Sequence, residues 1–389
     1  MSSAESKLEQ IRPAVQAALN KAVTDGPEIG VQVAAYLHGE LVADAWAGVA
    51  DQSTGRSVSG DTLFNVYSVT KAVAATALHM QAYRGLIDYD APVAKYWPEY
   101  AAHGKQKTTV RDVLTHRACV PQMPAGVTPE TMCDWQWMCR EIAELKPIAE
   151  PGTRTLYLSM TFGWLVGEMV RRTDPKGRSF GRFVREELAL PLKAPDLWIG
   201  VPDSVVPRIA RLRNDSPTMP AEHLPPLYTA SMPPQVDLVP EVFERQDVRR
   251  AEIAGVGGIF TARSEARFWA MLAQGGMLDG VRFVSKEQVA SFATPRSNAG
   301  ELDQVMFNIT IPLGMGGFWL GGDHPPVACP AHPQAICHPG AGNSIGWADL
   351  QTGLAVAICH NRMFNPLTVD ADPLLPIARS LKTALGLPI

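Results

Sequence analysis

Strand-forming sequence lies at both ends of this chain, and a long helix-forming stretch separates the two parts. Residues 29–51 read as two strands joined by a tight turn at His38-Gly39, which predicts a β-hairpin. Three more extended runs, with turns between them, occupy residues 313–323, 335–351 and 353–363. We therefore expect one antiparallel sheet that is built from both chain ends.

The stretch between the strands is helical and rich in loops, from Ser68 to about residue 240. Amphipathic patterns predict helices in residues 108–118, 159–173 and 179–192. Prolines cluster in residues 201–240, which indicates a long connection over the surface.

Two further helices are predicted at the ends of the chain. The first has apolar residues on one helical face, at Leu8, Ile11, Val15 and Leu19, and the second closes the chain over residues 371–386. The expected fold class is therefore α+β, an antiparallel sheet flanked by terminal helices, with an inserted, mainly helical domain.

The domain boundaries follow from this pattern. We expect the sheet domain in residues 1–66 and 243–389, and the inserted domain in residues 67–242. A cleft between two such parts is the natural place for a binding site. The chain crosses from one part to the other at Ser68.

The motif Ser68-Val-Thr-Lys71 stands where extended sequence gives way to an Ala-rich helix that stops at Gly85. A serine hydroxyl is a weak nucleophile at neutral pH and needs a base beside it. Lys71 can be that base if burial keeps its amine neutral. The helix N-terminus also offers free N–H groups where an oxyanion would form.

Two later segments supply partners for such a serine. The stretch "LYLSMTFGWL" offers Tyr157 as a second proton carrier, just ahead of a predicted helix. The stretch "CHPGAGNSIGW" offers a strand edge with a backbone N–H, and Gly340 in it permits close approach of the backbone.

The order S-x-x-K, then Y-x-(N/S), then (K/H)-x-G resembles the serine β-lactamase and penicillin-binding-protein superfamily. Within it the chain is most similar to class C β-lactamases and the related family VIII carboxylesterases. Further matching segments are "LFNVYSVTK", "GLIDYDAPVAKYWPEY", "TTVRDVLTHRACV" and "GVGGIFTARSEARFWAMLAQGGMLDGVRFVS". The resemblance covers about residues 28–362 and implies the same sheet-plus-helical-domain fold.

The resemblance also implies roles for individual residues. Ser68 would be the acylated nucleophile, Lys71 its general base, and Tyr157 the group that passes the proton to the leaving group. The backbone N–H groups of Ser68 and Ala341 would form the oxyanion hole. His338 stands where β-lactamases have the lysine of K-T-G.

Two departures from the β-lactamase pattern concern the substrate. Ser159 replaces an asparagine that helps to hold the substrate's amide side chain. His338-Pro339-Gly340 replaces Lys-Thr-Gly and so removes a fixed positive charge that would hold a β-lactam carboxylate. We therefore predict a carboxylesterase for short-chain esters, with Ser159, His338, Gly340 and Trp347 as substrate-binding residues.

Other activities remain open. A β-lactamase, a D-amino-acid peptidase or a linear-amide hydrolase would use the same residues, and an acyl-enzyme can also pass its acyl group to an alcohol. A non-catalytic scaffold is disfavoured because Ser68, Lys71 and Tyr157 are all present.

Composition limits the partners and the compartment. The net charge of −4 leaves no basic footprint for nucleic acid, and no run of about 18 apolar residues predicts a membrane span. The N-terminus has none of the features of a secretory signal, so we expect a cytoplasmic protein whose six cysteines are reduced. A small-molecule ester is the expected partner, with no cofactor and no metal.

Three other patterns offer competing sites. Residues 342–346, "GNSIG", match a nucleophile elbow around Ser344, but strand-like sequence follows instead of a helix. A Cys/His-rich loop could suggest zinc through His324, Cys329, His332, Cys337 and His338, but its spacing follows no familiar zinc pattern. His116 could be a general base, although no acid is placed beside it.

The segment around "DWQWM" leaves a further question open. Cys133 and Cys139 flank it, and buried thiols are expected there in place of a disulfide. Aromatic and methionine side chains in this region could line an acyl pocket or form a local helix core: Met123, Met132, Trp135 and Trp137.

Overall fold

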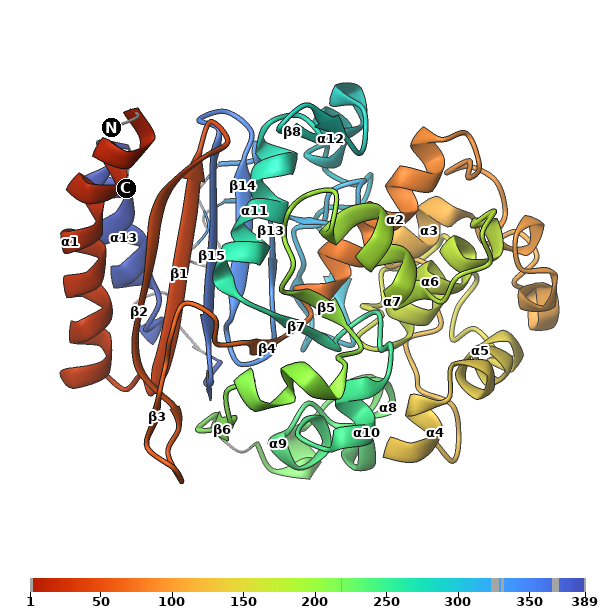
Figure 1. The fold of residues 1–389 in the computed structure, drawn as a ribbon. Helices are drawn as coiled ribbons and strands as arrows, with labels where there is room; N and C mark the ends of the chain where they lie inside the picture. The colour runs from red at the N-terminus through yellow and green to blue at the C-terminus, as the bar shows by residue number, and fades with distance from the viewer. Residues whose placement is uncertain (1–2, 218, 323–328, 330–331, 366–370, 388–389) are drawn as a thin grey trace.

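The computed structural model describes residues 3–217, 219–322, 329, 332–365 and 371–387. Its main sheet has seven antiparallel strands in the order β12-β13-β14-β15-β1-β2-β3 (Figure 1). Their bounds are β1 (Gly30–Leu37), β2 (Glu40–Asp51), β3 (Arg56–Ser57), β12 (Trp319–Leu320), β13 (Ala335–Pro339), β14 (Ile345–Asp349) and β15 (Leu354–His360). Strand β1 pairs with β15, so the two chain ends meet inside one sheet, as the sequence predicted.

Helices cover both faces of this sheet. The terminal helices α1 (Ser3–Thr24) and α13 (Leu375–Ala384) lie side by side on one face, and α11 (Ala262–Ala273) lies on the other (Figure 1). The predicted apolar face of α1 packs into a core against the sheet and α13 through Ile11, Val15 and Leu19. The predicted α+β architecture with flanking terminal helices is confirmed.

The inserted stretch is mainly helical, also as predicted. Its helices are α2 (Thr70–Tyr83), α3 (Val110–Leu114), α4 (Pro129–Cys133), α5 (Trp135–Glu144), α6 (Thr161–Thr173), α7 (Phe180–Phe183), α8 (Pro226–Ser231) and α9 (Pro240–Phe243). The helix expected over residues 179–192 is α7 followed by a π-helical segment, η3 (Val184–Ala189). The proline-rich residues 201–240 carry short helical turns, because proline at N1 starts a helix and cannot continue one.

A small second sheet links the insertion to the rest of the chain. Strands β4 (Phe64–Tyr67) and β5 (Leu197–Ile199) both pair with β7 (Gly258–Phe260). Strand β5 comes from the insertion, whereas β4 and β7 flank it. The domain boundaries near residues 67 and 242 stay a prediction.

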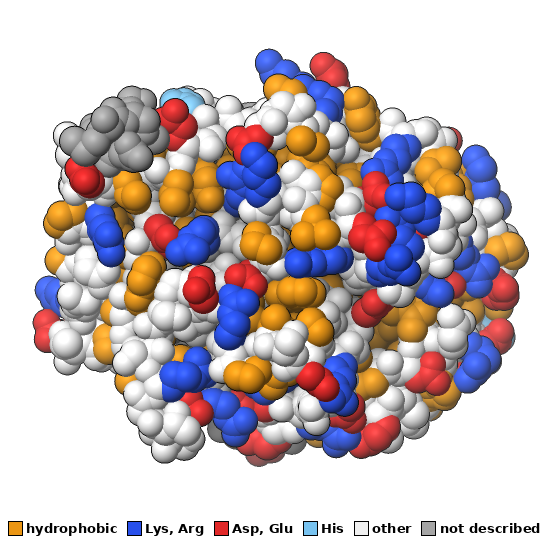
Figure 2. All heavy atoms as spheres, viewed as in Figure 1, with side chains coloured by type: hydrophobic (Ala, Val, Ile, Leu, Met, Phe, Trp, Pro, Cys, Tyr) orange, Lys and Arg blue, Asp and Glu red, His pale blue; other side chains and the backbone are white. Residues whose placement is uncertain are grey.

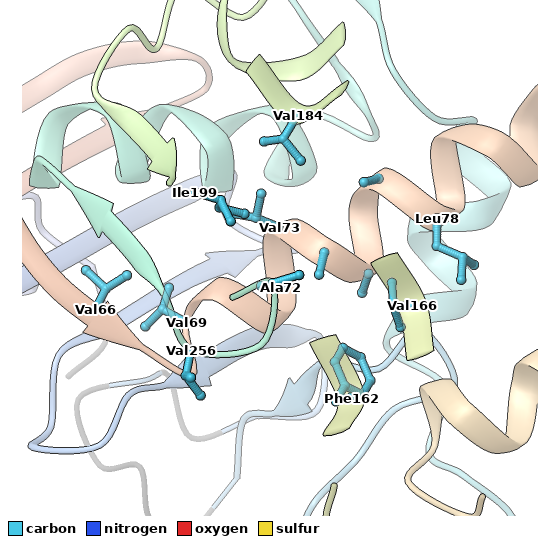
Figure 3. Close-up of a cluster of buried hydrophobic side chains, with 14 of the residues drawn as sticks. Val66, Val69, Ala72, Val73, Leu78, Phe162, Val166, Val184, Ile199 and Val256 are labelled. Carbon is cyan, nitrogen blue, oxygen red and sulfur yellow. The ribbon is translucent and has the colours of Figure 1, made fainter. Parts of the chain in front are cut away.

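Helix α2 lies at the centre of the helical part. Every residue from Thr70 to Gln81 is buried, so the helix is enclosed on all sides, and its alanines let neighbouring elements approach closely. Figure 3 shows Val73 and Leu78 of α2 in one core with Phe162 and Val166 of α6. The start of α2 is therefore held rigidly by packing.

Helix α11 carries a buried carboxyl group, Glu265, that faces the sheet. The Glu265 carboxyl accepts hydrogen bonds from Trp269 Nε1 and Cys359 Sγ, both at 3.3 Å. A Cβ on Gly346 of β14 would lie 2.3 Å from Glu265 Oε1, so the glycine leaves room for this group. Burial raises the pKa of Glu265 to about 7.

This carboxyl group predicts a pH-dependent stability. Because folding raises the pKa of Glu265, this group is protonated in both the folded and the unfolded state below the unfolded value near 4.5, and it then costs the fold nothing. As the pH rises towards 7, the unfolded state loses the proton first, so the free energy of unfolding falls. The free energy of unfolding of Glu265→Gln, measured relative to wild type, should therefore increase from pH 5 to pH 8 by on the order of 2–3 kcal/mol. Urea unfolding at both pH values measures this gain, with the exposed Glu40→Gln as control. An equal difference at both pH values would contradict the prediction.

The visible surface mixes charges of both signs. Figure 2 shows Lys and Arg side chains interspersed with Asp and Glu over the face that Figure 1 presents. Among the residues with described positions, no helix is both long enough and apolar enough to span a bilayer.

Candidate active site

A strained turn presents Ser68 at the start of α2. Strand β4 ends at Tyr67, whose φ of 44° is rare for a bulky residue, and Ser68 follows two residues before the first helical residue, Thr70. The Thr70 hydroxyl donates to the Tyr67 carbonyl and accepts from the Gly258 N–H at 2.8 Å. This threonine thereby ties the turn to β7 and fixes the place of Ser68, which is 8% exposed.

Lys71 has three hydrogen-bond partners and no exposed surface. Its Nζ lies 2.9 Å from Ser68 Oγ, 2.7 Å from the Ser159 carbonyl oxygen and 3.1 Å from the Gly255 carbonyl oxygen. Carbonyl oxygens only accept hydrogen bonds, so two N–H groups of the amine are committed to them. In the neutral amine the lone pair is then left for the Ser68 hydroxyl proton.

Burial lowers the pKa of Lys71 to about 7. Removing an ammonium group from water disfavours its charged form, and the two carbonyl oxygens carry no full charge that would offset this cost. A substantial fraction of Lys71 is therefore neutral near pH 7 and able to take a proton from Ser68.

Tyr157 lies beside this pair. Its ring is centred 5.4 Å from Lys71 Nζ and stacks on the His116 ring with 4.5 Å between centroids. Burial raises the pKa of Tyr157, while hydrogen bonding from Ser68 opposes the rise. The phenol therefore stays protonated at neutral pH, as a group that relays a proton requires.

The backbone around Tyr157 is held by two buried side chains. Its N–H donates to Asp303 Oδ2 at 2.7 Å, and the next N–H, of Leu158, donates to His116 Nδ1 at 2.8 Å. Because Nδ1 of His116 accepts, and because burial lowers the pKa of this histidine, the ring is neutral. His116 thus positions the Tyr157 segment, and the structure gives it no contact with Ser68.

Ser159 and His338 differ in what they offer a substrate. The Ser159 hydroxyl lies 3.0 Å from Ser231 Oγ, which in turn donates to the Tyr228 carbonyl at 2.8 Å. His338 Nδ1 lies 2.8 Å from the Pro339 carbonyl, so Nδ1 carries the proton and Nε2 a lone pair. Burial, with Lys71 nearby, lowers the pKa of His338 to about 3. His338 is therefore a neutral acceptor and not a cation.

Gly340 brings the end of β13 against the segment that precedes Ser68. A Cβ on Gly340 would lie 2.2 Å from the Val66 carbonyl oxygen, so only glycine allows this approach. Across the described part of the chain, no group accepts a hydrogen bond from the N–H of Ser68 or of Ala341. Both N–H groups therefore lack an acceptor among the described residues, as a donor to a ligand requires.

The structure separates Trp347 from the other predicted substrate-binding residues. In the register of β13 and β14, His338 pairs with Gly346 and Cys337 pairs with Trp347, so Trp347 lies on the opposite face of the sheet from His338. It has no exposed surface and packs in the core beneath α1 and α13. We leave Trp347 out of the proposed site.

The residues of the competing sites make structural contacts instead. Ser344 is buried, and its Oγ accepts from the His360 N–H at 3.3 Å, with β14 and not a helix after it. Cys337 and His338 point to opposite faces of β13, His332 contacts Asp349, and His324 lies outside the described residues. In the described ranges no three His, Cys, Asp or Glu side chains gather as a metal site.

The residues around "DWQWM" belong to the helical core. Met123 and Met132 are buried there, and Trp135 and Trp137 pack against the same cluster. Trp135 Nε1 donates to Glu168 Oε2 at 2.7 Å. Cys133 and Cys139 are free thiols.

Sequence reasoning missed several residues that build the site, among them Gly255, Thr70, Asp303 and Ser231. Gly255 packs so tightly on α6 that a Cβ at Gly163 would lie 2.0 Å from its nitrogen. This contact places the Gly255 carbonyl against Lys71. In the sequence, only the glycines of "GVGG" indicate a close approach of the backbone here. They do not reveal that Lys71 is the side chain that the Gly255 carbonyl contacts.

Comparison with known proteins adds to this geometry. A family model described as Beta-lactamase matches residues 16–378. The chain is 34% identical over 350 residues to "Esterase/beta-lactamase LipL" of Mycobacterium tuberculosis, covering 87% of this chain and 79% of that protein. It is similar to the crystal structure of a family VIII carboxylesterase, with a TM-score of 0.87, 30% identity and coverage of 96% and 97%. It is also similar to a penicillin-binding protein homolog from Caulobacter crescentus, with a TM-score of 0.83, 32% identity and 96% of each chain covered.

Proposed function

This chain belongs to the β-lactamase family and is a serine hydrolase, and we propose that Ser68, Lys71 and Tyr157 hydrolyse short-chain carboxylic esters through an acyl-enzyme. The observation that carries the proposal is the hydrogen bonding of Lys71. Its amine is buried, donates hydrogen bonds to two backbone carbonyl oxygens and lies 2.9 Å from Ser68 Oγ. A lysine in this setting is a general base.

Acylation proceeds from this geometry. Neutral Lys71 takes the proton of the Ser68 hydroxyl while Oγ forms a bond to the ester carbonyl carbon. The carbonyl oxygen becomes an oxyanion, and the free N–H groups of Ser68 and Ala341 stabilise it. The carbon–oxygen bond to the leaving group then breaks, and the proton passes from Lys71 through the Tyr157 hydroxyl to the departing alkoxide, which leaves as an alcohol.

Deacylation reverses these roles with water as the nucleophile. Water gives a proton to neutral Lys71, directly or through the Tyr157 hydroxyl, as its oxygen bonds to the acyl carbon, and the oxyanion forms between the same two N–H groups. The bond to Ser68 Oγ breaks, the proton returns to Oγ, and the carboxylic acid is released. No step needs a cofactor.

Ester preference follows from the groups around the nucleophile. A β-lactam depends on anchoring its carboxylate, and the residue at the anchoring position, His338, is neutral. Ser159 and Gly340 complete this side of the proposed substrate site. Amide-directed activity, on a β-lactam or a D-amino-acid peptide, is the alternative, because acylation of Ser68 would serve it equally; acyl transfer to an alcohol would share the same intermediate.

Four further expectations are part of the proposal. The substrate is a small-molecule ester, and no nucleic acid or membrane takes part, in line with a net charge of −4. The protein works in the cytoplasm. It needs no metal or other cofactor.

The proposal is tested by labelling with a fluorophosphonate, which reacts with activated serines. We expect one adduct per chain, located on Ser68 by peptide mapping, because Lys71 activates that hydroxyl alone. Ser68→Ala should show no adduct and no esterase activity while keeping the wild-type melting temperature. An adduct on Ser344, or esterase activity that survives in Ser68→Ala, would refute the proposed site.

A further inference from the structure

The turn between β13 and β14, residues 340–344, has an unusual backbone. Gly342 has a φ of 81° and Asn343 a φ of 89°. Glycine adopts this left-handed region freely, but a residue with a side chain adopts it at a cost that other contacts must offset. Asparagine at this position therefore suggests that its side chain is needed.

The Asn343 side chain is hydrogen-bonded to a buried carboxyl group that lies 29 residues later in the sequence. Asn343 Nδ2 donates to Asp372 Oδ1 at 2.8 Å, and the same oxygen accepts from the Leu374 N–H at 2.9 Å. Asn343 is 8% exposed and Asp372 is 4% exposed. Since Leu374 is the N-cap residue of α13, the Asn343–Asp372 pair anchors the turn to the start of the terminal helix.

The backbone of the turn is fixed at both ends. The Gly340 N–H donates to the Ser344 carbonyl at 2.7 Å, and the Asn343 N–H donates to the Gly340 carbonyl at 3.0 Å. The Ser344 hydroxyl accepts from the His360 N–H of β15. Ala341 lies inside this closed loop, and its N–H has no acceptor within the described ranges, so the direction of this N–H depends on how the loop is held.

The charged neighbours of Asp372 are also buried. Burial raises the pKa of Asp372, His360 lowers it, and Glu28 raises it. His360 Nδ1 lies 2.8 Å from Glu28 Oε2. The Ser344 end of the turn is thus bonded to His360 of β15, and His360 in turn lies against Glu28, just before β1.

We propose that Asn343 and Asp372 are positioning residues that aim the Ala341 N–H at the oxyanion formed on Ser68. This inference rests on the proposed function, because it takes Ala341 as an oxyanion donor. Neither side chain would touch the substrate. Their bond would hold a left-handed turn in the one conformation that places Ala341 beside the Val66–Ser68 segment, against which Gly340 packs.

The test compares variants that keep or remove the hydrogen bond. Asn343→Gly keeps the backbone conformation accessible and loses the side chain; Asp372→Ala loses the acceptor; Asp372→Asn keeps Oδ1 as an acceptor. We expect the first two to lower kcat for p-nitrophenyl butyrate about 10- to 100-fold with KM changed less than about threefold, since losing a whole oxyanion donor costs about 10²–10³-fold. Asp372→Asn should recover most of kcat.

The affinity for a transition-state analogue distinguishes a misdirected Ala341 N–H from a general loss of stability. A butyl boronic acid, which forms a tetrahedral adduct with the serine, should bind Asn343→Gly more weakly by the same factor by which kcat falls. Asn361→Ala is the matched control: Asn361 is also buried and its side chain donates to the carbonyls of Val49 and Arg211, so the melting temperature should fall without this loss of kcat.

The outcomes distinguish the two proposals. If Ser68 takes the fluorophosphonate and Asn343→Gly and Asp372→Ala keep wild-type kcat, the positioning role is wrong and the proposed function stands. If kcat falls but Asp372→Asn and Asp372→Ala fall alike and boronate affinity is unchanged, the pair is merely structural. If Ser68 is not labelled, the proposed function itself fails.

Discussion

Lys71→Met is expected to lower kcat/KM for p-nitrophenyl butyrate by at least about 10³-fold, in line with the loss of one member of a cooperative catalytic set. Methionine preserves most of the buried stem of Lys71 but offers no lone pair to the Ser68 hydroxyl proton. In the described part of the chain, the only side-chain nitrogen hydrogen-bonded to Ser68 Oγ is Lys71 Nζ. Steady-state kinetics on the purified variant, with its melting temperature, measures the effect.

Lys105→Met is the matched control for this substitution. Lys105 is also fully buried and also bonds to backbone carbonyls, those of Ala102 and Ala143, both at 2.9 Å. It makes no contact with Ser68. Its loss should lower the melting temperature and leave kcat of the folded enzyme near the wild-type value. Near-wild-type turnover by Lys71→Met would remove Lys71 as the base and return attention to His116.

The pH dependence of the wild type tests the same base. The neutral amine is the reactive form, and burial lowers the pKa of Lys71 to about 7, so kcat/KM should rise with pH through an apparent pKa near 7 and level off above it. An unburied lysine would give a rise near pH 10. A profile that is flat from pH 6 to pH 9 would contradict the assignment.

The local parts of this molecule were readable from the sequence. Alternation over residues 29–51 predicts the hairpin because strand pairing there is set by a two-residue turn, and His38 and Gly39 have the left-handed φ values of 52° and 84° that such turns use. The spacing of Ser68 and Lys71 likewise predicts side chains within reach of each other, and the turn that leads into α2 brings them together, since the Lys71 N–H donates to the Ser68 carbonyl at 3.0 Å.

The non-local parts were not readable. Lys71 is bonded to carbonyl oxygens 88 and 184 residues away in sequence, and a backbone carbonyl has no residue type that a pattern could reveal. Trp347 shows a different limit. Adjacent residues of a strand face opposite sides, so its place depends on the register of β13 and β14, which sequence alternation in a fully buried strand does not fix.

Substrate choice gives the second large effect. Wild-type kcat/KM for p-nitrophenyl butyrate should exceed that for nitrocefin, a β-lactam, by at least about 10- to 100-fold. A charged contact to the lactam carboxylate contributes about 1.5–3 kcal/mol, which is about 10- to 100-fold in affinity, and His338 cannot supply it because its pKa is about 3. An ester needs less anchoring, because its leaving group departs without the protonation that an amine requires.

The double variant His338→Lys with Ser159→Asn should narrow this ratio by raising nitrocefin turnover relative to ester turnover. Lysine restores a cation where the carboxylate would lie, and asparagine restores an amide beside the Ser231 hydroxyl that Ser159 now contacts. His338→Gln, of similar size but neutral, is the control and should leave the ratio unchanged, since the argument depends on charge. A wild-type value for nitrocefin equal to or above the ester value would defeat the esterase proposal in favour of amide-directed activity. A double variant with an unchanged ratio would instead show that discrimination lies elsewhere than in the lost carboxylate and amide contacts.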